Sequence, residues 1–567
     1  ADNAIDVSSS VDGSTGSSGA TLAVVVVDAD TRAYIDGSTS TPTTGDLVDS
    51  ITLTATTNST AASSATSTAQ GADNDESSTN QTTTLLGDPD GDGDNSDRAA
   101  TSEGNINFAG ALALTIVNNV TESYVASNDD IATETGGTDP RITITASDTE
   151  SSSATADGSN TGSGATGIGV GVALNFTDVD SRAWLDGSGS LDSSGILVSA
   201  TLAGGDTFSA EAKSGAGNAG KVSFAGSLAI NVADTFVEAA VLDDASLNLG
   251  DTPLTLVASN TAKATASAVP DVDDADADGD LNTEEGLGIG ASVALNIANN
   301  DSRAIIGTDA TFTNASDISL KATGDFTTET EAKGGSAGGT ALTPVGAVTV
   351  ALNDTVAEVG TGTSTLTLSG DLNLEATQSA TTETTAEGDA KGNSAAIGAS
   401  IGFTTAVNNA YTNLLRDTTS TAGSIQLLSR GTSSTRTNAK ASAAGAQEDS
   451  ADASDDNRVN DTADAQRNLA ADRSEEDIGG TDTPDAESSD GAGGASSVSV
   501  AAAISINIDE TNTRSSIADG VTVDSDGLLT LDAKANADTA TIADRSASDG
   551  TTGIGAAVAL NTANTVN

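Results

Sequence analysis

The stretch GIGVGVALNFTDVDSRAWLDGSGSLDSSGILVSATL, residues 167–202, decides the fold. Its first half alternates with a period of two, which is typical of a β-strand. A Gly-, Asp- and Ser-rich turn follows, and ILVSATL predicts a second strand. One face of the first strand carries large apolar side chains, at Ile168, Val170, Val172, Leu174 and Phe176, and the other carries Gly167, Gly169, Gly171, Ala173 and Asn175.

We interpret the large apolar face as the core face. The small face lacks charge, and such a smooth surface lets another sheet approach closely. We therefore expect a second layer on the small face, either within the chain or from a neighbouring fibre. The alternative is an exposed strand without large side chains.

The same pattern recurs along the chain, which indicates a repeat architecture. A second clear copy is GIGASVALNIANNDSRAIIGTDATFTNASDISLKAT, residues 288–323, and a partial copy ends the chain at 553–567. Taking Asn175 as the anchor, the equivalent positions are Val25, Thr115, Asn231, Asn296, Asn353, Thr405, Asn507 and Asn561. Most anchors follow one another at intervals of roughly 52–65 residues, a period typical of repeat proteins.

Stacked strands would place equivalent residues ~4.8 Å apart, so we expect the anchor asparagines to form a hydrogen-bonded ladder. Charges that alternate along the stack favour the same arrangement, because opposite charges on neighbouring strands attract. Seven residues beyond each anchor the sequence has Arg32, Glu122, Arg182, Glu238, Arg303, Thr412 and Arg514, with Glu358 displaced by a gap. Chance alternation is the competing explanation.

Helical patterns are nearly absent, so we predict an all-β fold. The expected architecture is one repetitive domain over 1–567, an elongated parallel β-solenoid of about eight units. Each unit spans roughly 52–65 residues. Whether a unit is one wide coil or several narrow ones stays open. Acidic loop inserts are expected at about 72–104, 270–286 and 446–492, because insertions that preserve the flanking pattern belong on surface loops.

Composition excludes several classes of protein. Aromatic residues make up 2% of the chain, and Cys, Met and His are absent. The net charge of −61 opposes binding to nucleic acid or anionic lipid. No apolar run is long enough to span a membrane. The chain opens ADNAIDVSSS without a signal peptide, so we interpret it as a mature protein or an excised segment. A halophilic source is an alternative explanation of the acid excess.

The segment DADADGDLNTEE, residues 274–285, matches the twelve-residue calcium loop position by position. Calcium requires six to eight hard oxygen ligands, and this spacing wraps them around one ion. The candidate ligands are Asp274, Asp276, Asp278, Asp280 through its carbonyl, Asn282 and Glu285. A solvated acidic linker is the alternative.

A weaker match is DPDGDGDNSD, residues 88–97, in which Asp88, Asp90, Asp92 and Asp94 fit the first half of the loop. The twelfth position is Ala99, so the bidentate ligand is missing there. The third acidic stretch, 449–490, lacks this spacing, and we expect a solvated loop. Calcium is the one cofactor that the sequence predicts.

Catalysis finds little support in the sequence. Without His or Cys, a Ser-His-Asp or Cys-His nucleophile cannot form. Carboxylate pairs remain available for glycosidic chemistry, but they are too abundant to discriminate. We therefore expect no enzyme, with a carbohydrate-active β-helix enzyme or a glycan-binding module as the alternatives. Trp184 is interpreted as structural.

The phrases SVALNIANNDSRAIIGTDATF, GVALNFTDVDSRAWLDGSGSL and TRAYIDGS resemble the repeats of giant bacterial filamentous adhesins, the haemagglutinin- and leukotoxin-like surface proteins. The resemblance covers most of the chain. It implies a secreted, surface-attached β-solenoid that serves adhesion or matrix formation, as in a biofilm. The expected partners are copies of the chain itself, in end-to-end or lateral contacts through the small-residue faces, and glycans or the surface of a host or neighbouring cell.

Overall fold

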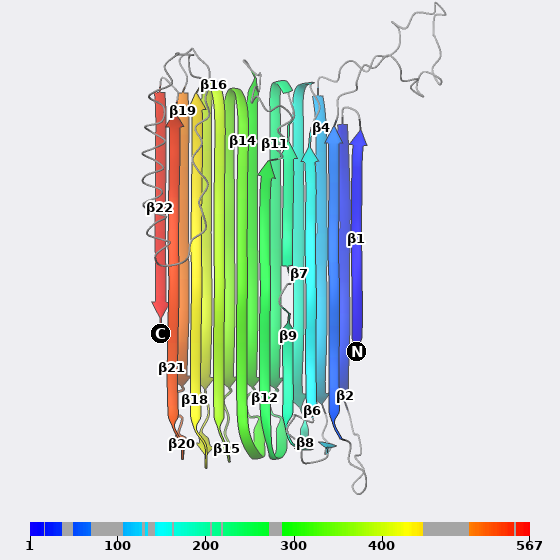
Figure 1. Cartoon of the computed structure of the whole chain (residues 1–567), viewed down its shortest axis with the longest axis vertical. Coiled ribbons are helices and arrows are strands. Elements are labelled where there is room, and N and C mark those ends of the chain that lie inside the picture. The colour runs from blue at the N-terminus through cyan, green and yellow to red at the C-terminus, as the bar shows by residue number, and fades with distance from the viewer. Residues whose placement is uncertain are drawn as a thin grey trace, which may run out of the picture.

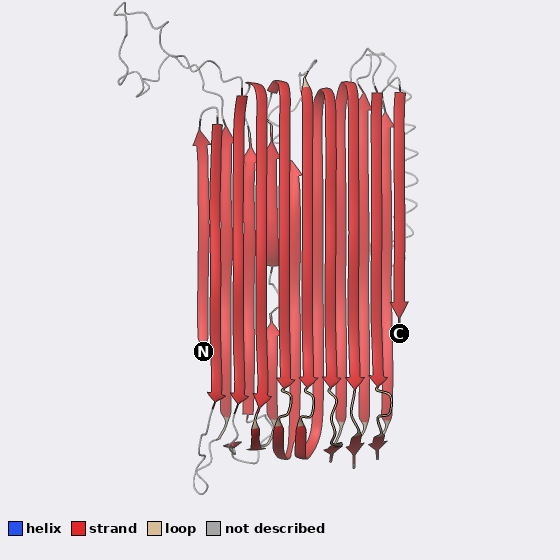
Figure 2. Ribbon diagram, turned by 180° about the vertical axis from the view of Figure 1, so that it is seen from behind, coloured by secondary structure: helices blue, strands red, loops and turns tan. Residues whose placement is uncertain are grey.

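The computed structural model describes residues 1–15, 18–36, 49–69, 106–126, 131–133, 142–160, 164–203, 207–216, 219–270, 286–445, 498–548 and 552–567. Its described part is all-β and contains no helix. Every strand pairing is parallel, and the strands form two long sheets that face each other (Figures 1 and 2). The predicted all-β, parallel, β-solenoid-like repeat fold is confirmed at this level.

The strands divide between the two sheets according to their hydrogen-bonded neighbours. The first sheet contains β2 (Ser18–Asp36), β4 (Ile106–Ala126), β7 (Gly164–Asp186), β11 (Ala219–Val241), β13 (Leu287–Ile306), β19 (Val498–Ile517) and β22 (Thr552–Val566). The second sheet contains β1 (Asp2–Thr15), β3 (Ile51–Ala69), β6 (Ile142–Ser159), β9 (Ile196–Leu202), β10 (Thr207–Gly215), β12 (Ser246–Pro270), β18 (Ile425–Gly445) and β21 (Leu529–Ser548).

Two very long strands pass from the second sheet into the first. β14 (Thr311–Val359) pairs with β12 through its first part and with β13 through its last part. β16 (Leu372–Leu414) likewise pairs with β18 and then with β19. The chain therefore alternates between the two sheets, and each strand pairs with the equivalent strand of the preceding repeat.

Each repeat forms one wide coil and not several narrow ones, because equivalent residues of successive repeats pair directly. Asn175 pairs with Asn231, and Asn231 pairs with Asn296, so the register advances by one repeat from strand to strand. The strands run along the longest axis of the molecule (Figure 1). The described part is therefore a broad slab rather than a narrow rod elongated along its stacking axis.

The assignment of the core face was wrong. In β7 the small residues Gly167, Gly169, Gly171, Ala173 and Asn175 are buried between the sheets, as expected for a face covered by a second layer of the same chain. The large apolar residues Ile168, Val170, Val172 and Leu174 are only half-buried, and Phe176 is 38% exposed, because they lie on the outer face of the first sheet. Lateral bundling through the small-residue faces is excluded in turn, since the second sheet covers them.

The inward face needs small residues because the two backbones approach each other closely at one end of the slab. A Cβ added to Gly169 would lie 1.8 Å from the carbonyl oxygen of Gly215, and one added to Gly290 would lie 1.9 Å from that of Gly335. Toward the other end the inward residues become larger, with Val179 and Leu185 of β7 packed against Val198 in one aliphatic cluster. The distance between the two sheets therefore increases along the strands, from the end where only glycine fits to the end where leucine is buried.

Short strands build the wide end, where the chain turns from the first sheet to the second: β5 (Ile131–Ala132), β8 (Ser188–Asp192), β15 (Leu366–Leu368), β17 (Thr418–Ser420) and β20 (Val523–Ser525). Aspartates in these turns bind the next coil. The Asp243 carboxylate accepts a hydrogen bond from the Thr308 amide at 2.6 Å, and Asp309 accepts one from the Thr363 amide at 2.9 Å. Asp309 has a φ of 53°, which aspartate tolerates better than most residues.

Arg416 links three successive turns at this end. Its side chain is 2% exposed, and the guanidinium donates to the carbonyl oxygens of Gly360 at 2.7 Å, Gly307 at 2.6 Å and Ala310. Burial lowers the pKa of Arg416. Planar guanidinium donors suit several carbonyl acceptors at once, so this residue fastens coils that lie 56 and 109 positions earlier in the chain.

Candidate functional site

The predicted calcium ligands lie outside the described residues. This holds for Asp274, Asp276, Asp278, Asp280, Asn282 and Glu285, and also for Asp88, Asp90, Asp92 and Asp94. The strands that border the three acidic segments end at Ala69, Pro270 and Gly445 and begin again at Ile106, Leu287 and Val498. These strand ends lie at the narrow end of the slab, which is at the top of Figure 1. Within the described ranges, no group of three or more Asp or Glu side chains could hold a metal.

The predicted asparagine ladder is present inside the first sheet. Asn175 Nδ2 donates to Asn231 Oδ1 at 2.8 Å, and Asn231 Nδ2 donates to Asn296 Oδ1 at 2.9 Å. Asn507 and Asn561 form a third such bond at 3.1 Å. Buried amides that satisfy one another along the stacking axis fix the register, because a slip by one residue would turn the amide of the slipped strand to the outer face and leave its neighbour buried without that partner.

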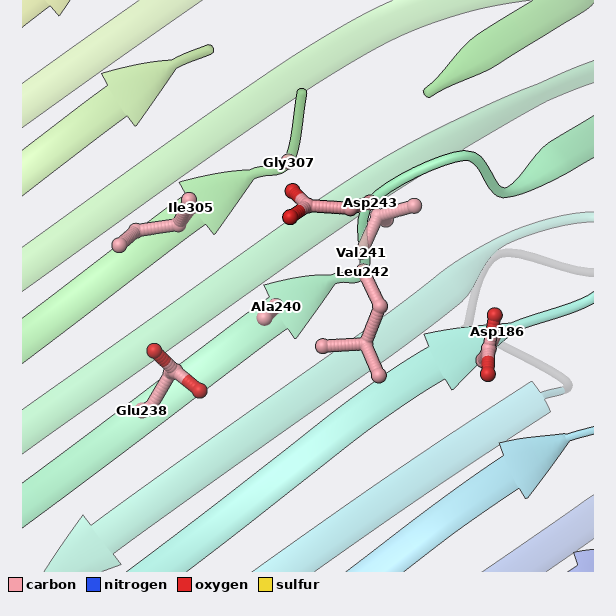
Figure 3. A pocket seen from close by; sticks show the side chains of 8 residues that line it. All are labelled: Asp186, Glu238, Ala240, Val241, Leu242, Asp243, Ile305 and Gly307. Carbon is pink, nitrogen blue, oxygen red and sulfur yellow. The ribbon is translucent and has the colours of Figure 1, made fainter. Parts of the chain in front are cut away.

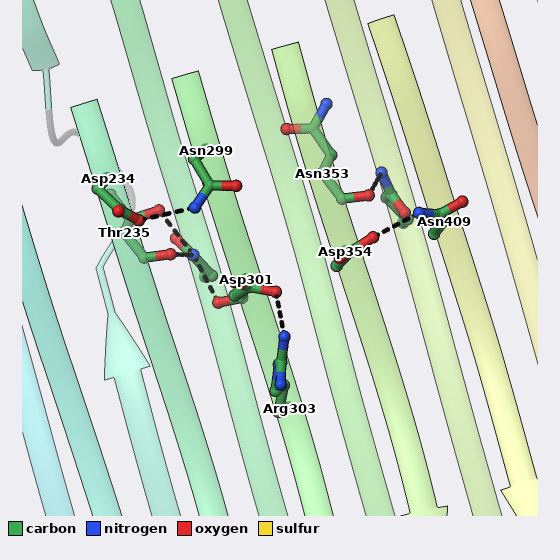
Figure 4. Close-up of polar contacts among 10 residues, drawn as sticks. Asp234, Thr235, Asn299, Asp301, Arg303, Asn353, Asp354 and Asn409 are labelled. Carbon is green, nitrogen blue, oxygen red and sulfur yellow. Dashed lines mark hydrogen bonds and ion pairs between the residues drawn. The ribbon is translucent and has the colours of Figure 1, made fainter. Parts of the chain in front are cut away.

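Two anchor positions were wrong. The partner of Asn296 is Thr349 rather than Asn353, and the next residue in that column is Thr404 rather than Thr405. Asn353 instead belongs to a second buried ladder four residues further along, in which Asn300 donates to Asn353 and Asn353 donates to Asn408, each at 2.8 Å. Figure 4 shows this region. Asn353 resembles an anchor in the sequence because the asparagine ladder moves to a column four residues further along, beyond the inward column of Ala298 and Ala351.

A third row of amide and carboxylate pairs follows the outer face beside these ladders (Figure 4). Asn299 donates to Asp234 at 3.0 Å, and Asn409 donates to Asp354 at 2.6 Å. These bonds join neighbouring strands of the first sheet. They offset part of the repulsion between the acidic side chains on this face.

The predicted alternation of charge holds over the first five strands of the first sheet. Arg32, Glu122, Arg182, Glu238 and Arg303 occupy one column in register. Ion pairs form between Arg32 and Glu122 at 2.7 Å and between Arg182 and Glu238 at 3.3 Å. The phenyl ring of Phe236 lies between two of these cations, 4.9 Å from the Arg182 guanidinium and 5.4 Å from that of Arg303.

Beyond Arg303 the predicted column was wrong for Glu358 and Thr412 and correct for Arg514. The residue that pairs with Arg303 is Val356, and the column then continues through Tyr411 to Arg514. Glu358 pairs with Ile305, and Thr412 pairs with Ala357, so both lie in other columns. Glu358 lies two residues beyond Val356, and Thr412 lies one residue beyond Tyr411, as Thr405 lies one residue beyond the true anchor Thr404.

The outer face of the first sheet carries three adjacent columns of large apolar side chains. Each column continues in register from strand to strand. One of them contains Leu22, Leu112, Val172, Leu228, Val293, Ile401, Ile504 and Val558. Val26 is 61% exposed, and Ile401 is 49% exposed. A contiguous apolar surface of this extent is typical of an interaction site.

Three aromatic rings stack at the far edge of the same outer face. The Tyr34 and Tyr124 ring centroids are 5.0 Å apart, and those of Tyr124 and Trp184 are 4.4 Å apart, with nearly parallel planes. The stack follows the strand register, so each ring covers the face of the next. Tyr124 covers one face of the Trp184 indole ring, which favours the structural interpretation of this residue.

The outer face of the second sheet is polar. Its outward columns are rich in hydroxyl groups, as in the row Thr56, Ser147, Thr201, Ser259, Thr323 and Thr377. Ion pairs between neighbouring residues decorate it, including Lys263 with Glu329 at 2.8 Å. The two outer faces of the slab therefore differ sharply in polarity.

A pocket of about 400 Å³ lies near the wide end, lined by Asp186, Glu238, Ala240, Val241, Leu242, Asp243, Ile305 and Gly307 (Figure 3). Each of its carboxylates already accepts a hydrogen bond. Glu238 pairs with Arg182, Asp243 accepts from the Thr308 amide, and Asp186 accepts from the Gly187 amide at 2.6 Å. The pocket adds no argument for the enzyme alternative.

Two further carboxylates, which the sequence did not single out, are buried between the sheets. Asp148 and Glu150 of β6 are both fully buried, and they face Asn119 and Thr121 of β4. Burial raises the pKa of Asp148 to about 7, against hydrogen bonds from Thr121 and the Thr149 amide that lower it. Their spacing of two residues places both on the inward face of one strand, but two acidic residues alone do not signal a site in a chain that has 82 of them.

No family model, no curated protein and no solved structure matches this chain. Among the described residues, no helix is long and apolar enough to cross a membrane.

Proposed function

We infer that this chain is a structural component of an extracellular or cell-surface filament or adhesin, rather than an enzyme. The observation that carries this inference is the parallel pairing of strands throughout both sheets, with buried asparagine ladders along the stacking axis. Such a design supplies stiffness and repeated outer faces rather than a single reactive centre. In this proposal the chain holds about eight repeat units, and each unit forms one coil of roughly 52–65 residues.

The proposed partner is a second copy of this chain, bound face to face through the apolar outer surface of the first sheet. Three apolar columns about 7 Å apart, continued across strands at ~4.8 Å intervals, cover roughly 900 Å². A standard protein interface uses about 800 Å² from each partner. The area is therefore sufficient for a stable lateral contact, which replaces the small-residue contact that the sequence suggested. End-to-end contacts between copies stay part of the proposal.

Calcium is the proposed cofactor. The chain carries 82 acidic residues against 21 basic ones, and this repulsion opposes a compact state unless cations offset it. The oxygen-rich loop 274–285 and its weaker relative at 88–97 have the composition for such ions. We expect a chelator to lower the melting temperature of the protein at low salt, and an unchanged melt would contradict the calcium part of the proposal.

The lateral contact is tested by placing charge on the apolar surface. Val293→Lys combined with Ile401→Lys changes two residues that are 46% and 49% exposed. The matched control, Ser379→Lys combined with Thr381→Lys, adds the same charge to the exposed polar face of the second sheet. At ~0.15 M salt, where charges are screened beyond about 8 Å, sedimentation and electron microscopy should show lateral assembly in the wild type and the control only.

Two outcomes would contradict the lateral contact. One is a wild-type protein that stays monomeric at every concentration, in calcium and in moderate salt. The other is equal assembly by the apolar-face variant and the control. Neither outcome bears on calcium binding, which the chelator experiment tests separately.

A glycan-binding module remains the second candidate function, because the second sheet presents in-register rows of hydroxyl groups such as Thr323 and Thr377. Hydroxyl arrays can exchange hydrogen bonds with sugar hydroxyls. Binding of glycans in an array, lost in the Ser379→Lys and Thr381→Lys variant and kept in the apolar-face variant, would favour this candidate over the structural one.

A further inference from the structure

The carboxylates of Asp148 and Glu150 converge on one point between the two sheets. The Nδ2 atom of Asn119 lies 3.1 Å from Asp148 Oδ1, 3.0 Å from Asp148 Oδ2 and 3.2 Å from Glu150 Oε2. An amide nitrogen carries only two hydrogens. It therefore occupies a position where three carboxylate oxygens meet, but it cannot donate a full hydrogen bond to each of them.

A second buried aspartate of the same interior shows how neutral groups satisfy a carboxylate in this fold. Asp509 of β19 is 1% exposed and accepts hydrogen bonds from Thr435, Thr511, Ser433 and Asn408. Four side-chain donors thus surround one carboxylate there. Asn119 donates to both carboxylates of the other pair, and Thr121 donates to Asp148.

Further oxygen atoms around this pair have no hydrogen-bond partner. They are Ser59 Oγ, Thr31 Oγ1 and Asn119 Oδ1, all on side chains that are at most 4% exposed. Ser59 lies beside Glu150 in register and on the same inward face, and Thr31 lies beside Thr121. Unsatisfied buried oxygens are costly in a native structure, so several of them around two carboxylates require an explanation.

We propose that Asp148, Glu150, Asn119 and Ser59 form a buried binding site for one calcium ion between the two sheets, separate from the acidic loops. Two carboxylates match the charge of a divalent ion, and hydroxyl and amide oxygens are ligands that calcium accepts. Flipping the Asn119 side-chain amide replaces its nitrogen with its oxygen at the convergence point, and such an exchange requires no movement of the backbone.

The location of the site determines how the ion enters it. Strands of both sheets enclose these residues, so the ion is taken up while β4 and β6 pack together. Ion binding is then linked to folding, as in proteins whose metal site does not exist in the unfolded chain. The inference goes beyond the proposed filament role and does not depend on it.

The test compares three full-length proteins that are refolded from denaturant in chelator, sodium or calcium: the wild type, Asp148→Asn combined with Glu150→Gln, and the control Asp509→Asn. The double variant keeps the side-chain shapes and removes both charges. We expect calcium to raise the melting temperature of all three proteins through the loops, with a smaller rise in the double variant. Equilibrium dialysis should show one calcium ion fewer in the double variant than in the control.

Equal calcium stoichiometry and equal calcium-dependent melting in the double variant and the control would overturn the site. A stabilisation that sodium alone reproduces would overturn its assignment to a divalent ion. If the double variant does not fold, Asn119→Asp provides the converse test, since a third carboxylate should lower the melting temperature in chelator and tighten calcium binding. An Asn119→Asp protein without either change would also refute the site.

Discussion

The close approach of the two sheets predicts that Gly169 tolerates no side chain. A methyl group added there would lie 1.8 Å from the Gly215 carbonyl oxygen and 2.6 Å from that of Gly158. Favourable carbon–oxygen contacts lie at ~3.3 Å or more, so the sheets must separate locally by more than 1 Å. Both obstructing atoms belong to backbone, and no rotamer change can relieve the contact.

The expected cost of Gly169→Ala follows from this geometry. Overpacking a tightly packed interior costs about 1–3 kcal/mol, and we expect the upper end of this range because the backbone itself must move. The matched control is Gly346→Ala on the outer face of the first sheet, where an added Cβ meets no atom within 4 Å. That change should stabilise the protein by ~0.5 kcal/mol, because alanine restricts the unfolded chain.

Thermal and urea unfolding followed by circular dichroism measure both variants against the wild type. The expected order of stability is Gly346→Ala, then wild type, then Gly169→Ala. A Gly169→Ala protein that unfolds at or above the wild-type midpoint would show that the sheets are not packed this closely, and the account of the small inward face would fail with it.

Four further variants test individual features. Asn231→Leu breaks a buried ladder and should cost ~1–3 kcal/mol by leaving amide groups unpaired, whereas Asn561→Ala, at the exposed end of its ladder, should change unfolding little. Burial raises the pKa of Asp509 above its ordinary value of 3.8. The protonated side chain therefore contributes its full stability below pH 3.8, and this contribution is lost as pH rises through the pKa of the folded state. Asp509→Asn should flatten the fall in melting temperature over that range, and an unchanged pH profile would contradict the raised pKa of Asp509. Arg182→Ala removes a partly exposed ion pair and should cost at most ~0.5 kcal/mol, less at high salt. Arg416→Met leaves three buried carbonyls without their donor and should cost ~2–5 kcal/mol in urea unfolding; a neutral effect would exclude its role in fastening the coils.

The repeat could be predicted because it depends on the spacing of residues along the sequence. Alternation at residues 167–176 identified the strands, and the recurrence of Asn175, Asn231 and Asn296 identified residues that lie on neighbouring strands. Period-two patterns and equal spacings depend on short-range geometry, which a sequence displays directly. The stacking and the first ladder were therefore accessible without coordinates.

The orientation of the strands was not accessible in the same way. Large side chains such as Val172 and Leu174 usually mark the core, but here the gap between the sheets beside them holds Gly171, Ala173 and Asn175. The absence of charge on the small face was the available signal, and it correctly indicated a covering layer. The spacing between two backbones is a property of the assembled coil, and no local pattern encodes it.

The candidate site was the least predictable part. The pairing of Asn296 with Thr349 depends on a shift of register that equal spacing cannot reveal. Asp148 and Glu150 gain their importance only from Asn119 and Ser59, which lie about 30 and 90 residues earlier in the chain. The loop ligands at 274–285 stay a prediction from sequence.

The direction of the strands also governs how the slab bears mechanical load. A pull along the stacking axis opens the hydrogen bonds of one coil after another, so the force needed stays near that of a single strand pair. A pull along the strands must shear a whole pair at once, and β11 and β13 share twenty paired residues. A surface component built in this way would resist tension along its strands and would lengthen stepwise, absorbing energy, when stretched along its stacking axis.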